Sequence, residues 1–233
     1  MKKIVVFGAN GPTGRLLVRQ ALDRGYNVTA VTRHPAGYPI QAENLRVLGG
    51  DVYDPASVEQ AVAGQEAVLS VLGVPFSRKP VKVYSEGMAN IMQAMQKWGV
   101  RRLVCVTSSA TDTQAGAHGG FLFEKVLQPF VVEVLGKTLY QDMRKMEAMV
   151  QTSDLEWTIV RPSGLFETGE VTSYKVAENY LSSKFTSRAD LAASMLQFSA
   201  DNRYSRKIMA VGTYAVRPSF ISLLWREGFA KKA

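Results

Sequence analysis

The chain has very few of the residues from which disulfide frameworks and Cys/His metal sites are built. Its 233 residues include one cysteine, Cys105, and two histidines. A single thiol cannot form an intrachain disulfide, and no cluster has the spacing of metal ligands, so we expect no bound metal. Cys105 lies within the apolar run 103–106, which favours a buried structural thiol over a nucleophile.

Long apolar runs are also absent. The run that follows Lys2 and Lys3 is only as long as a strand before Gly8 interrupts it, so it does not have the form of a secretory signal. No apolar stretch elsewhere reaches the length that a transmembrane helix requires. We therefore expect a soluble, cytoplasmic protein without a transmembrane segment.

Basic residues outnumber acidic ones, and the formal net charge is +8. Such an excess can indicate a nucleic-acid or membrane-surface partner. The cations are scattered along the chain, however, and the only dense groups are the pairs Arg101-Arg102 and Lys231-Lys232. No segment combines a basic stripe with stacking aromatics, so we expect no nucleic-acid partner. The excess suits a phosphate-rich small ligand instead.

Three glycines, Gly8, Gly11 and Gly14, lie between an apolar run at residues 4–7 and a segment with helical apolar periodicity at residues 15–22. They therefore occupy a strand-to-helix turn. In such a turn the first glycine permits the tight bend, the second lets backbone N–H groups approach a pyrophosphate, and the third lets the helix pack closely on the strand. The helix N-terminus adds N–H donors and a partial positive charge. The turn residues that we expect to bind a dinucleotide are Gly8, Asn10, Gly11, Pro12, Thr13 and Gly14.

Strands and helices alternate along the rest of the chain. Short apolar runs predict strands at residues 4–7, 27–33, 45–48, 67–72, 102–107, 156–160 and 207–211. Helical periodicity predicts helices at residues 15–22, 55–63, about 81–98, 121–135, 139–151 and 187–198. Asp54 is expected to cap the second helix and Gly99 to end the third. This order predicts an α/β fold, a Rossmann-type doubly wound parallel sheet with helices on both faces and ligands at the carboxyl ends of its strands.

The length of the chain suits one domain. We expect residues 1–212 to form an NAD(P)-binding Rossmann domain with a small C-terminal substrate region. The stretch 108–120, rich in Ser, Thr, Ala and Gly, follows a central strand and is expected to face the substrate. Residues 213–233 have the pattern of an amphipathic helix, which would either pack back on the domain or form a homodimer or surface contact.

The end of the second predicted strand, at Arg33, indicates which dinucleotide binds. An Asp or Glu there would accept a hydrogen bond from the ribose 2′-hydroxyl of NAD, whereas a guanidinium matches the 2′-phosphate of NADP. Arg33 therefore favours NADP(H) over NAD(H), unless it is simply a solvated charge. Asp51 and Val52 follow the third strand and are placed to meet the adenine, although Asp51 could equally be a turn residue. Leu72 and Gly73 follow the fourth strand and are expected to line the middle of the cofactor.

Several motifs resemble those of the atypical short-chain dehydrogenase/reductases. They are Gly8-Ala-Asn-Gly-Pro-Thr-Gly14, Val31-Thr-Arg33, Gly50-Asp51-Val52, Ser85-Glu-Gly87, Val106-Thr-Ser108 and Thr158-Ile-Val-Arg-Pro162. Within that group the chain is most similar to the NAD(P)H-binding branch that includes flavin reductase/biliverdin reductase B and the NmrA-like proteins. The resemblance covers about residues 1–212 and implies a Rossmann fold, a nicotinamide cofactor and, in an enzyme, hydride transfer. It also implies that Thr107 and Pro162 belong to the cofactor site.

The best-known branch of that superfamily uses a Tyr-x-x-x-Lys pair on one helix face for proton transfer. Tyr140 and Arg144 have the spacing of such a pair. The register argues against it, because the relatives' Tyr-x-x-x-Lys-x-x-x-Glu pattern aligns its glutamate with Glu147 and thereby puts Leu139 and Met143 at the tyrosine and lysine positions. On this interpretation the pair is missing, and Tyr140 is an ordinary helix residue.

A serine hydroxyl is then the remaining candidate for catalysis. The resemblance to the flavin/biliverdin reductases puts Ser108 beside the nicotinamide and the substrate, with Ser109 next to it. A neutral hydroxyl can orient a carboxamide or a flavin edge but is a poor acid, so catalysis would rest mainly on positioning of the hydride donor. Ser108 could instead be a turn residue at the strand end. Those relatives also carry a histidine where this chain has Ser163, which weakens the case for biliverdin as the substrate.

The main hypothesis is an NADPH-dependent reductase that transfers a hydride to a small electron acceptor, such as a flavin, a quinone or a conjugated carbonyl. The alternative is a redox sensor of NmrA type, which binds NADP(H) without turnover and transmits its occupancy to a protein partner. The missing Tyr/Lys pair favours the sensor, and Ser108 favours the enzyme. A sugar-nucleotide epimerase fits less well, because the chain lacks both that pair and an extensive C-terminal substrate domain.

Overall fold

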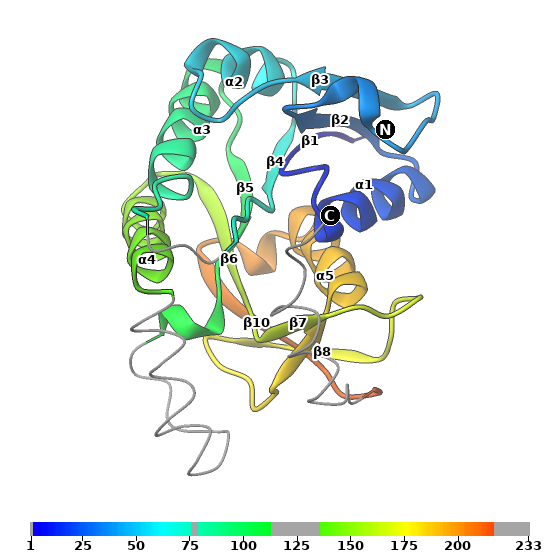
Figure 1. Ribbon diagram of the computed structural model, residues 1–233, viewed down its shortest axis with the longest axis vertical. Coiled ribbons are helices and arrows are strands. Elements are labelled where there is room, and N and C mark those ends of the chain that lie inside the picture. Colours follow the sequence, from blue (N-terminus) through cyan, green and yellow to red (C-terminus); the bar gives the residue numbers. More distant parts are fainter. Residues whose placement is uncertain (1, 76–78, 113–135, 217–233) are drawn as a thin grey trace.

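A computed structural model describes residues 2–75, 79–112 and 136–216 (Figure 1). Its main feature is an eight-stranded sheet in the order β3-β2-β1-β4-β5-β6-β10-β8. The strands of this sheet are β1 (Lys3–Phe7), β2 (Asn27–Thr32), β3 (Leu45–Gly49), β4 (Ala67–Ser70), β5 (Arg102–Val106), β6 (Glu156–Pro162), β8 (Tyr174–Glu178) and β10 (Lys207–Thr213). The helices are α1 (Pro12–Asp23), α2 (Pro55–Val62), α3 (Ser85–Trp98), α4 (Lys137–Gln151) and α5 (Arg188–Ala200). The Rossmann-type α/β fold predicted from the sequence is confirmed.

The winding direction of the sheet reverses between β1 and β4. β1 pairs in parallel with β2 on one side and with β4 on the other. From β1 the chain winds outward to β2 and β3, and it then returns to β4 and continues to β5 and β6. In a doubly wound sheet, the carboxyl ends of the two strands at this switch point flank the ligand-binding crevice. Since the Gly-rich turn follows β1, the fold places it at the switch point.

One edge of the sheet departs from the all-parallel prediction. β8 pairs antiparallel with β10. β8 belongs to a connection between β6 and α5 that also contributes β7 (Gly164–Phe166) and β9 (Phe185–Ser187), which pair with each other. The side chains of β8 are either half-buried or exposed, as is typical of an edge strand with one solvated face. Such a strand carries only a weak apolar signal, which is why the sequence does not predict it.

Helices cover both faces of the sheet (Figure 1). α1 and α5 pack on the face that contains Ile4 and Val6, whereas α2, α3 and α4 pack on the face that contains Val5 and Phe7. Successive residues of a strand point to opposite faces, so the single strand β1 contributes to both cores. A strand buried on both faces is what the continuous apolar run at the start of the chain predicts.

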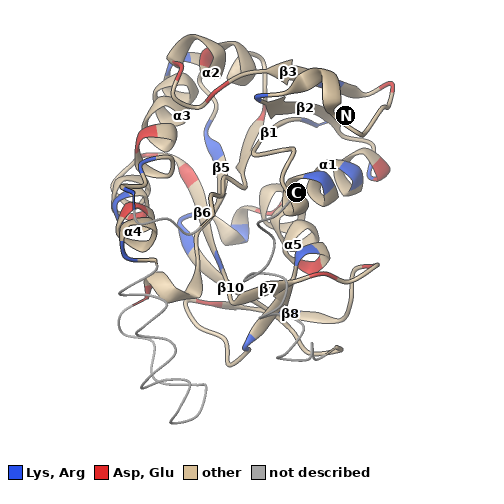
Figure 2. Ribbon diagram, viewed as in Figure 1, with Lys and Arg blue, Asp and Glu red and all other residues tan. Residues whose placement is uncertain are grey.

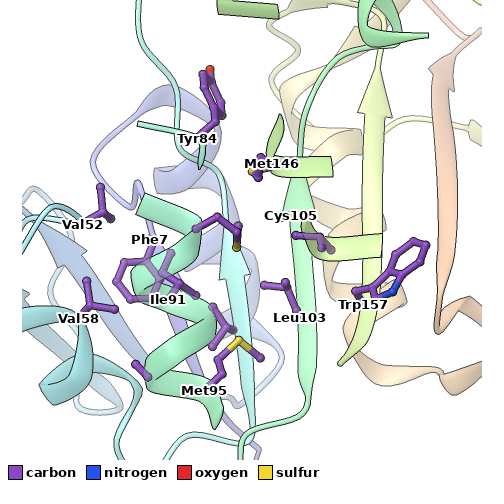
Figure 3. Close-up of a cluster of buried hydrophobic side chains, with 14 of the residues drawn as sticks. Phe7, Val52, Val58, Tyr84, Ile91, Met95, Leu103, Cys105, Met146 and Trp157 are labelled. Carbon is purple, nitrogen blue, oxygen red and sulfur yellow. The ribbon is translucent and has the colours of Figure 1, made fainter. Parts of the chain in front are cut away.

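The core beneath α2, α3 and α4 is packed with aliphatic and sulfur-containing side chains (Figure 3). Met88, Ile91 and Met95 of α3 belong to the same buried cluster as Leu103 and Cys105 of β5. The methionines of α3 therefore serve as core packing. Cys105 is fully buried, and burial raises the pKa of its thiol. The prediction of a structural thiol is confirmed.

Two of the predicted helix-end signals are in place. The carboxylate of Asp54 accepts hydrogen bonds from two N–H groups of the first turn of α2, at 3.1 and 3.3 Å. Gly99 ends α3 in the left-handed conformation, with φ of 67°. α3 begins at Ser85 rather than near residue 81, at the point where the buried carboxylate of Asp142 accepts a hydrogen bond from the N–H of Tyr84, at 2.9 Å. This contact comes from α4 and has no local signal.

Several predicted features lie wholly or mostly outside the described residues. These are the helix expected at residues 121–135, the loop beyond residue 112 and the tail from residue 217 onward. Residue 213, the expected start of the tail, is instead the last residue of β10. Within the described ranges, no helix combines the length and the apolar character needed to cross a bilayer. Across those same ranges, no group of three or more His, Cys, Asp or Glu side chains is arranged to hold a metal ion.

Candidate cofactor-binding site

The turn between β1 and α1 is shaped by its glycines. Gly8 has a left-handed backbone with φ of 79°, and a Cβ placed on it would lie 2.6 Å from the carbonyl oxygen of Val71. A Cβ on Gly14 would lie 2.2 Å from the carbonyl oxygen of Gly8, so any side chain there would collide with the backbone of the turn. The two glycines therefore have the expected roles, which are the tight bend and the close approach of helix to strand.

The N-terminus of α1 has no side-chain cap. Its N-cap residue is Gly11, and Pro12 occupies the first helical position. The first intrahelical hydrogen bond runs from the N–H of Arg15 to the carbonyl of Gly11, at 2.9 Å. The N–H groups of Thr13 and Gly14 lie ahead of that bond, and no acidic residue is present in the first turn. Backbone donors in this position at a positive helix end suit a phosphate.

The turn lies beside the residues that follow β4. A Cβ on Gly8 would come within 3.0 Å of the backbone nitrogen of Leu72, so the ends of β1 and β4 are in close contact. Gly73 is exposed and faces open space. The predicted residues that share this carboxyl edge of β1, β4, β5 and β6 are Gly8, Leu72, Gly73, Thr107, Ser108 and Pro162. The structure thus brings together strand ends that are far apart in the chain.

The adenosine end of the predicted site is basic. Arg33 directly follows β2, and its side chain is exposed. Arg15 donates from Nε and Nη2 to Oδ1 of Asn10, at 3.1 and 2.8 Å, which holds a second guanidinium against the turn. The hydroxyl of Tyr38 donates to the carbonyl of Ala9 at 3.3 Å, and burial raises the pKa of Tyr38 to about 12, so that this donor keeps its proton.

Asp51 and Val52 are held by turn and core contacts. The carboxylate of Asp51 accepts a hydrogen bond from the N–H of Tyr53 at 3.1 Å, and its carbonyl accepts one from the hydroxyl of Ser57 at 2.9 Å. Val52 is buried, and its carbonyl accepts a hydrogen bond from the side chain of Asn90 at 2.8 Å. The turn role of Asp51 is therefore present in the structure. Contact of either residue with adenine stays a prediction.

A buried carboxylate ties the end of β5 to α4 and β6. Glu147 of α4 is only 3% exposed. It accepts hydrogen bonds from the hydroxyls of Thr107 and Thr111, at 2.6 and 2.9 Å. Nε and Nη2 of Arg161 also donate to it, at 3.0 and 2.7 Å, and Nη1 of Arg161 donates to Asp112 at 3.2 Å. This network compensates the buried charge and holds the segment that follows β5 in one conformation.

The sequence identifies only part of this network. It predicts Thr107 as a cofactor contact, whereas Glu147 and Arg161 enter only as members of family motifs. A signal for Glu147 does exist, because a carboxylate is rare on the apolar face of a helix, and Glu147 lies there between Met143 and Val150. Its partners carry no such signal, since pairing of β5 with β6 and packing of α4 bring them together.

Ser108 lies at the expected strand end, where its hydroxyl already has a backbone partner. Its Oγ accepts a hydrogen bond from the N–H of Ala110 at 3.2 Å and thereby caps the short 3₁₀ helix Ser109–Thr111. Ser108 is half-buried and Ser109 is exposed. The turn role of Ser108 is therefore present. The hydroxyl only accepts in this contact, so it retains a hydrogen that it can donate.

Ser163, the residue that stands where the relatives carry histidine, anchors the connection that forms β7, β8 and β9. Its hydroxyl donates to the carbonyl of Ser183 at 2.7 Å, and its N–H donates to the hydroxyl of Thr186 at 3.0 Å. Both partners lie at or next to β9. The side chain of Ser163 therefore holds the end of β6 against this connection.

Apolar side chains occupy the positions on α4 that the register assigns to the proton-transfer pair. Leu139 and Met143 are buried in the core, and Tyr140 is buried in the same cluster. Glu147 lies on the same helix face, about two turns beyond Leu139 and one turn beyond Met143. The burial of Tyr140 in the core agrees with its interpretation as an ordinary helix residue.

One basic residue near the turn is not predicted from the sequence. Arg188 begins α5, and its Nη1 donates to the hydroxyl of Thr13 at 3.2 Å. The two residues are 175 positions apart in the chain. They meet because α1 and α5 lie side by side on one face of the sheet (Figure 1). No spacing rule connects them.

Comparison with known proteins identifies the family. A family model described as NAD(P)H-binding matches residues 8–202. The chain belongs to this family. The match begins at the first glycine of the turn and extends beyond the end of α5, so it covers the strand ends and helix N-terminus described above.

This NAD(P)H-binding protein is similar to several curated proteins over part of their length. It is 29% identical over 174 residues to an uncharacterized chloroplastic protein of Arabidopsis thaliana, with 70% of this chain and 59% of that protein covered. It is 35% identical over 115 residues to cinnamoyl-CoA reductase 1 of Oryza sativa subsp. japonica, with 45% and 34% covered. The chain thus spans less than two thirds of the length of these relatives.

Solved structures show the same fold. A short-chain dehydrogenase/reductase from Veillonella parvula, determined in complex with NADP, is 22% identical and has a TM-score of 0.77, with 94% of this chain and 99% of that chain covered. The anaerobilin reductase ChuY from Escherichia coli O157:H7 is 20% identical and has a TM-score of 0.76, with 94% and 100% covered. At these identities the likeness is one of fold.

Proposed function

We propose that this protein is an NADPH-dependent reductase that transfers a hydride to a small electron acceptor, such as a flavin, a quinone or a conjugated carbonyl. The observation that carries the proposal is the glycine-shaped turn at the switch point between β1 and β4, with the Ser108 segment at the end of the neighbouring β5. Membership of the NAD(P)H-binding family supports the cofactor class. The turn fits a pyrophosphate because it is free of the side chains that Gly8 and Gly14 exclude, and because the first-turn N–H groups of α1 precede the first intrahelical hydrogen bond without a side-chain cap.

The proposed cofactor contacts run along the strand ends from the adenosine to the nicotinamide. They are Arg33, Asp51, Val52, Gly8, Asn10, Gly11, Pro12, Thr13, Gly14, Leu72, Gly73, Thr107, Ser108 and Pro162. Preference for NADP(H) rests on Arg33, because no carboxylate follows β2 and an exposed guanidinium can bind a 2′-phosphate through two hydrogen bonds. One structural relative was determined in complex with NADP, which agrees with this preference.

Positioning is the chemical contribution that we assign to the chain. When bound, NADPH would supply the hydride, and the acceptor would take one proton from water. Ser108 retains a hydroxyl hydrogen that it can donate to a carboxamide or to the edge of the acceptor. Glu147 and Arg161 are paired with each other, so their role is to hold the Ser108 segment and not to move a proton.

Arg33→Ser tests the cofactor preference. Thermal-shift titration of the wild type should show tighter binding of NADPH than of NADH. A ligand at a hundred times its dissociation constant stabilises the fold by about 2.7 kcal/mol, which such a titration resolves. The variant should lose about tenfold or more in NADPH affinity and bind NADH unchanged. Arg46→Ser, which removes an exposed arginine from β3, is the matched control and should leave both affinities unchanged. Equal stabilisation of the wild type by the two cofactors would contradict the preference.

Turnover is tested separately, by following loss of NADPH absorbance with a panel of flavins, quinones and conjugated aldehydes. Oxidation by at least one acceptor class, above the rate without protein, is the expected result.

The buried Leu139 and Met143 favour a second function, in which the protein binds NADP(H) without turnover and acts as a redox sensor of NmrA type. Tight NADPH binding without oxidation by any acceptor would support this sensor and overturn the reductase.

The cytoplasmic location, the division of the chain at residue 212 and a homodimer or surface contact through the tail stay predictions. One relative is named as chloroplastic, which belongs to that protein alone. Size-exclusion chromatography with light scattering, applied to the full chain with and without NADPH, would test the homodimer.

A further inference from the structure

We propose that Arg188, the first residue of α5, binds the diphosphate of the dinucleotide. This inference rests on the proposed function and adds a cation that the Gly-rich motif does not contain. Nη1 of Arg188 donates to the hydroxyl of Thr13 at 3.2 Å. Thr13 is the second residue of α1, and its N–H is one of the donors that precede the first intrahelical hydrogen bond. The guanidinium therefore lies at the rim of the phosphate-binding helix end.

The Arg188 side chain is directed along α1 toward its N-terminus. A second contact places the start of α5, because Nε2 of Gln20 donates to the carbonyl of Ala189 at 3.1 Å. Thr13 precedes Gln20 by about 10 Å along the axis of α1, at the usual rise per residue. The start of α5 thus lies within reach of the Gln20 side chain, whereas Nη1 of Arg188 contacts Thr13, closer to the N-terminus of α1.

The electrostatics at this place favour an anion. A guanidinium close to a helix N-terminus opposes the helix dipole, whereas an anion bound between them is attracted by both. The first turn of α1 has no acidic residue. The carboxylate nearest to Arg188 along α5, Asp190, is fully buried and accepts hydrogen bonds from the N–H and hydroxyl of Thr172, at 2.6 and 2.8 Å. Arginines lie on both helices, Arg15 and Arg19 on α1 and Arg188 at the start of α5 (Figure 2).

A diphosphate suits this arrangement better than a single phosphate does. A helix N-terminus carries only about half a positive charge, whereas a diphosphate carries two negative ones. A guanidinium adds a full charge and two parallel donors that match phosphate oxygens. Arg188 should therefore contribute to binding of dinucleotides and contribute nothing to ligands that contain only the adenosine end.

Arg188→Gln tests the inference through binding alone. Isothermal titration of the full chain with NADPH and with adenosine 2′-monophosphate, which lacks the diphosphate, should give different results. The variant is expected to lose about tenfold in NADPH affinity and to bind adenosine 2′-monophosphate within about twofold of the wild type. Arg19→Gln is the matched control, because it removes the same charge from an exposed position on α1, and it should change neither affinity.

The outcomes separate this inference from the proposed function. Unchanged NADPH affinity in Arg188→Gln, or an equal loss for both ligands, would overturn the role of Arg188 while wild-type binding of NADPH stands. Failure of the wild type to bind any nicotinamide dinucleotide would overturn the proposed function itself. If Arg188→Gln does not fold, Arg188→Met keeps a long unbranched side chain without the charge, and the same two titrations decide the question.

Discussion

At the scale of single residues, Gly14 is the position where the turn tolerates a side chain least. A Cβ there would lie 2.2 Å from the carbonyl oxygen of Gly8 and 2.8 Å from the backbone of Ala9. Both neighbours are main-chain atoms of the same turn, so neither can rotate away as a flexible side chain would. The helix can accept a methyl group only by moving away from β1, and that movement would displace the phosphate-binding N–H groups.

Gly14→Ala is therefore expected to lower the free energy of unfolding by about 3 kcal/mol and to abolish NADPH binding. Urea unfolding measures the first effect and thermal-shift titration the second. Gly169→Ala is the matched control, because a Cβ at Gly169 meets no atom within 4 Å, and it should change stability by no more than about 0.5 kcal/mol. Normal stability of Gly14→Ala would show that α1 can shift without cost.

The sequence predicts a role for Arg33 but not for Arg188. Arg33 is informative from the sequence because its role follows from its place at the end of β2, which is a local feature. Arg188 lies at the start of a helix with no phosphate-binding motif, and only its contact with Thr13 points to a role. Position within an element predicts the first residue, and packing between elements reveals the second.

At the scale of elements, Glu147 joins α4 to the ends of β5 and β6. Its carboxylate is the shared acceptor for Thr107, Thr111 and Arg161. Removing the charge would leave the buried guanidinium of Arg161 with Asp112 as its one remaining ionic partner among the described residues. The segment that carries Ser108 would then be held less tightly against α4.

Glu147→Gln is expected to lower the free energy of unfolding by about 3 kcal/mol, because one partner of a buried ion pair is neutralised. Hydrogen exchange should also become faster at residues 107–112. Asp142→Asn is the matched control on the same helix, since its buried carboxylate accepts from the N–H of Tyr84 at the start of α3. It should speed exchange near residue 84 and leave 107–112 unchanged. Unchanged exchange at 107–112 in Glu147→Gln would refute the positioning role.

Among the elements, the sequence predicts those that have a strong local signal. Asp54 caps α2 and Gly99 ends α3, because a short polar side chain and a left-handed glycine act within one turn of their own position. β8 is missed because its side chains alternate weakly, and its partner β10 is distant in the chain. The local pattern says that a segment is a strand, but it does not determine which edge that strand joins.

At the scale of the whole molecule, folding buries one thiol and two tyrosine hydroxyls, and burial disfavours the ionised form of each. Burial raises the pKa of the Cys105 thiol above its ordinary value of 9.0. It also raises the pKa of Tyr84 and of Tyr38 from 10.0 to about 12. In the unfolded chain these groups lose their protons at the ordinary values, whereas in the folded protein they remain protonated to higher pH.

The stability that these three groups contribute should therefore be fully present below about pH 9 and should be lost as the pH rises from there toward about 12, because ionisation then favours the unfolded chain. Urea unfolding midpoints measured at about pH 8 and about pH 10.5 check the sign. Tyr84→Phe should reduce the difference between the two midpoints, since it removes one of the contributing groups. A midpoint that is higher at the alkaline pH would contradict the expectation.

The amino-acid sequence by itself determined the Gly-rich turn, the order of the parallel strands and the basic residue at the end of β2. Each of these depends on residues that are neighbours in the chain, so glycine geometry and apolar periodicity suffice to predict them. Only the tertiary structure decided that Glu147 holds Thr107 and that Arg188 reaches Thr13. These pairs are 40 and 175 positions apart, and they meet because strands pair side by side and helices pack against a common sheet, which no local pattern encodes.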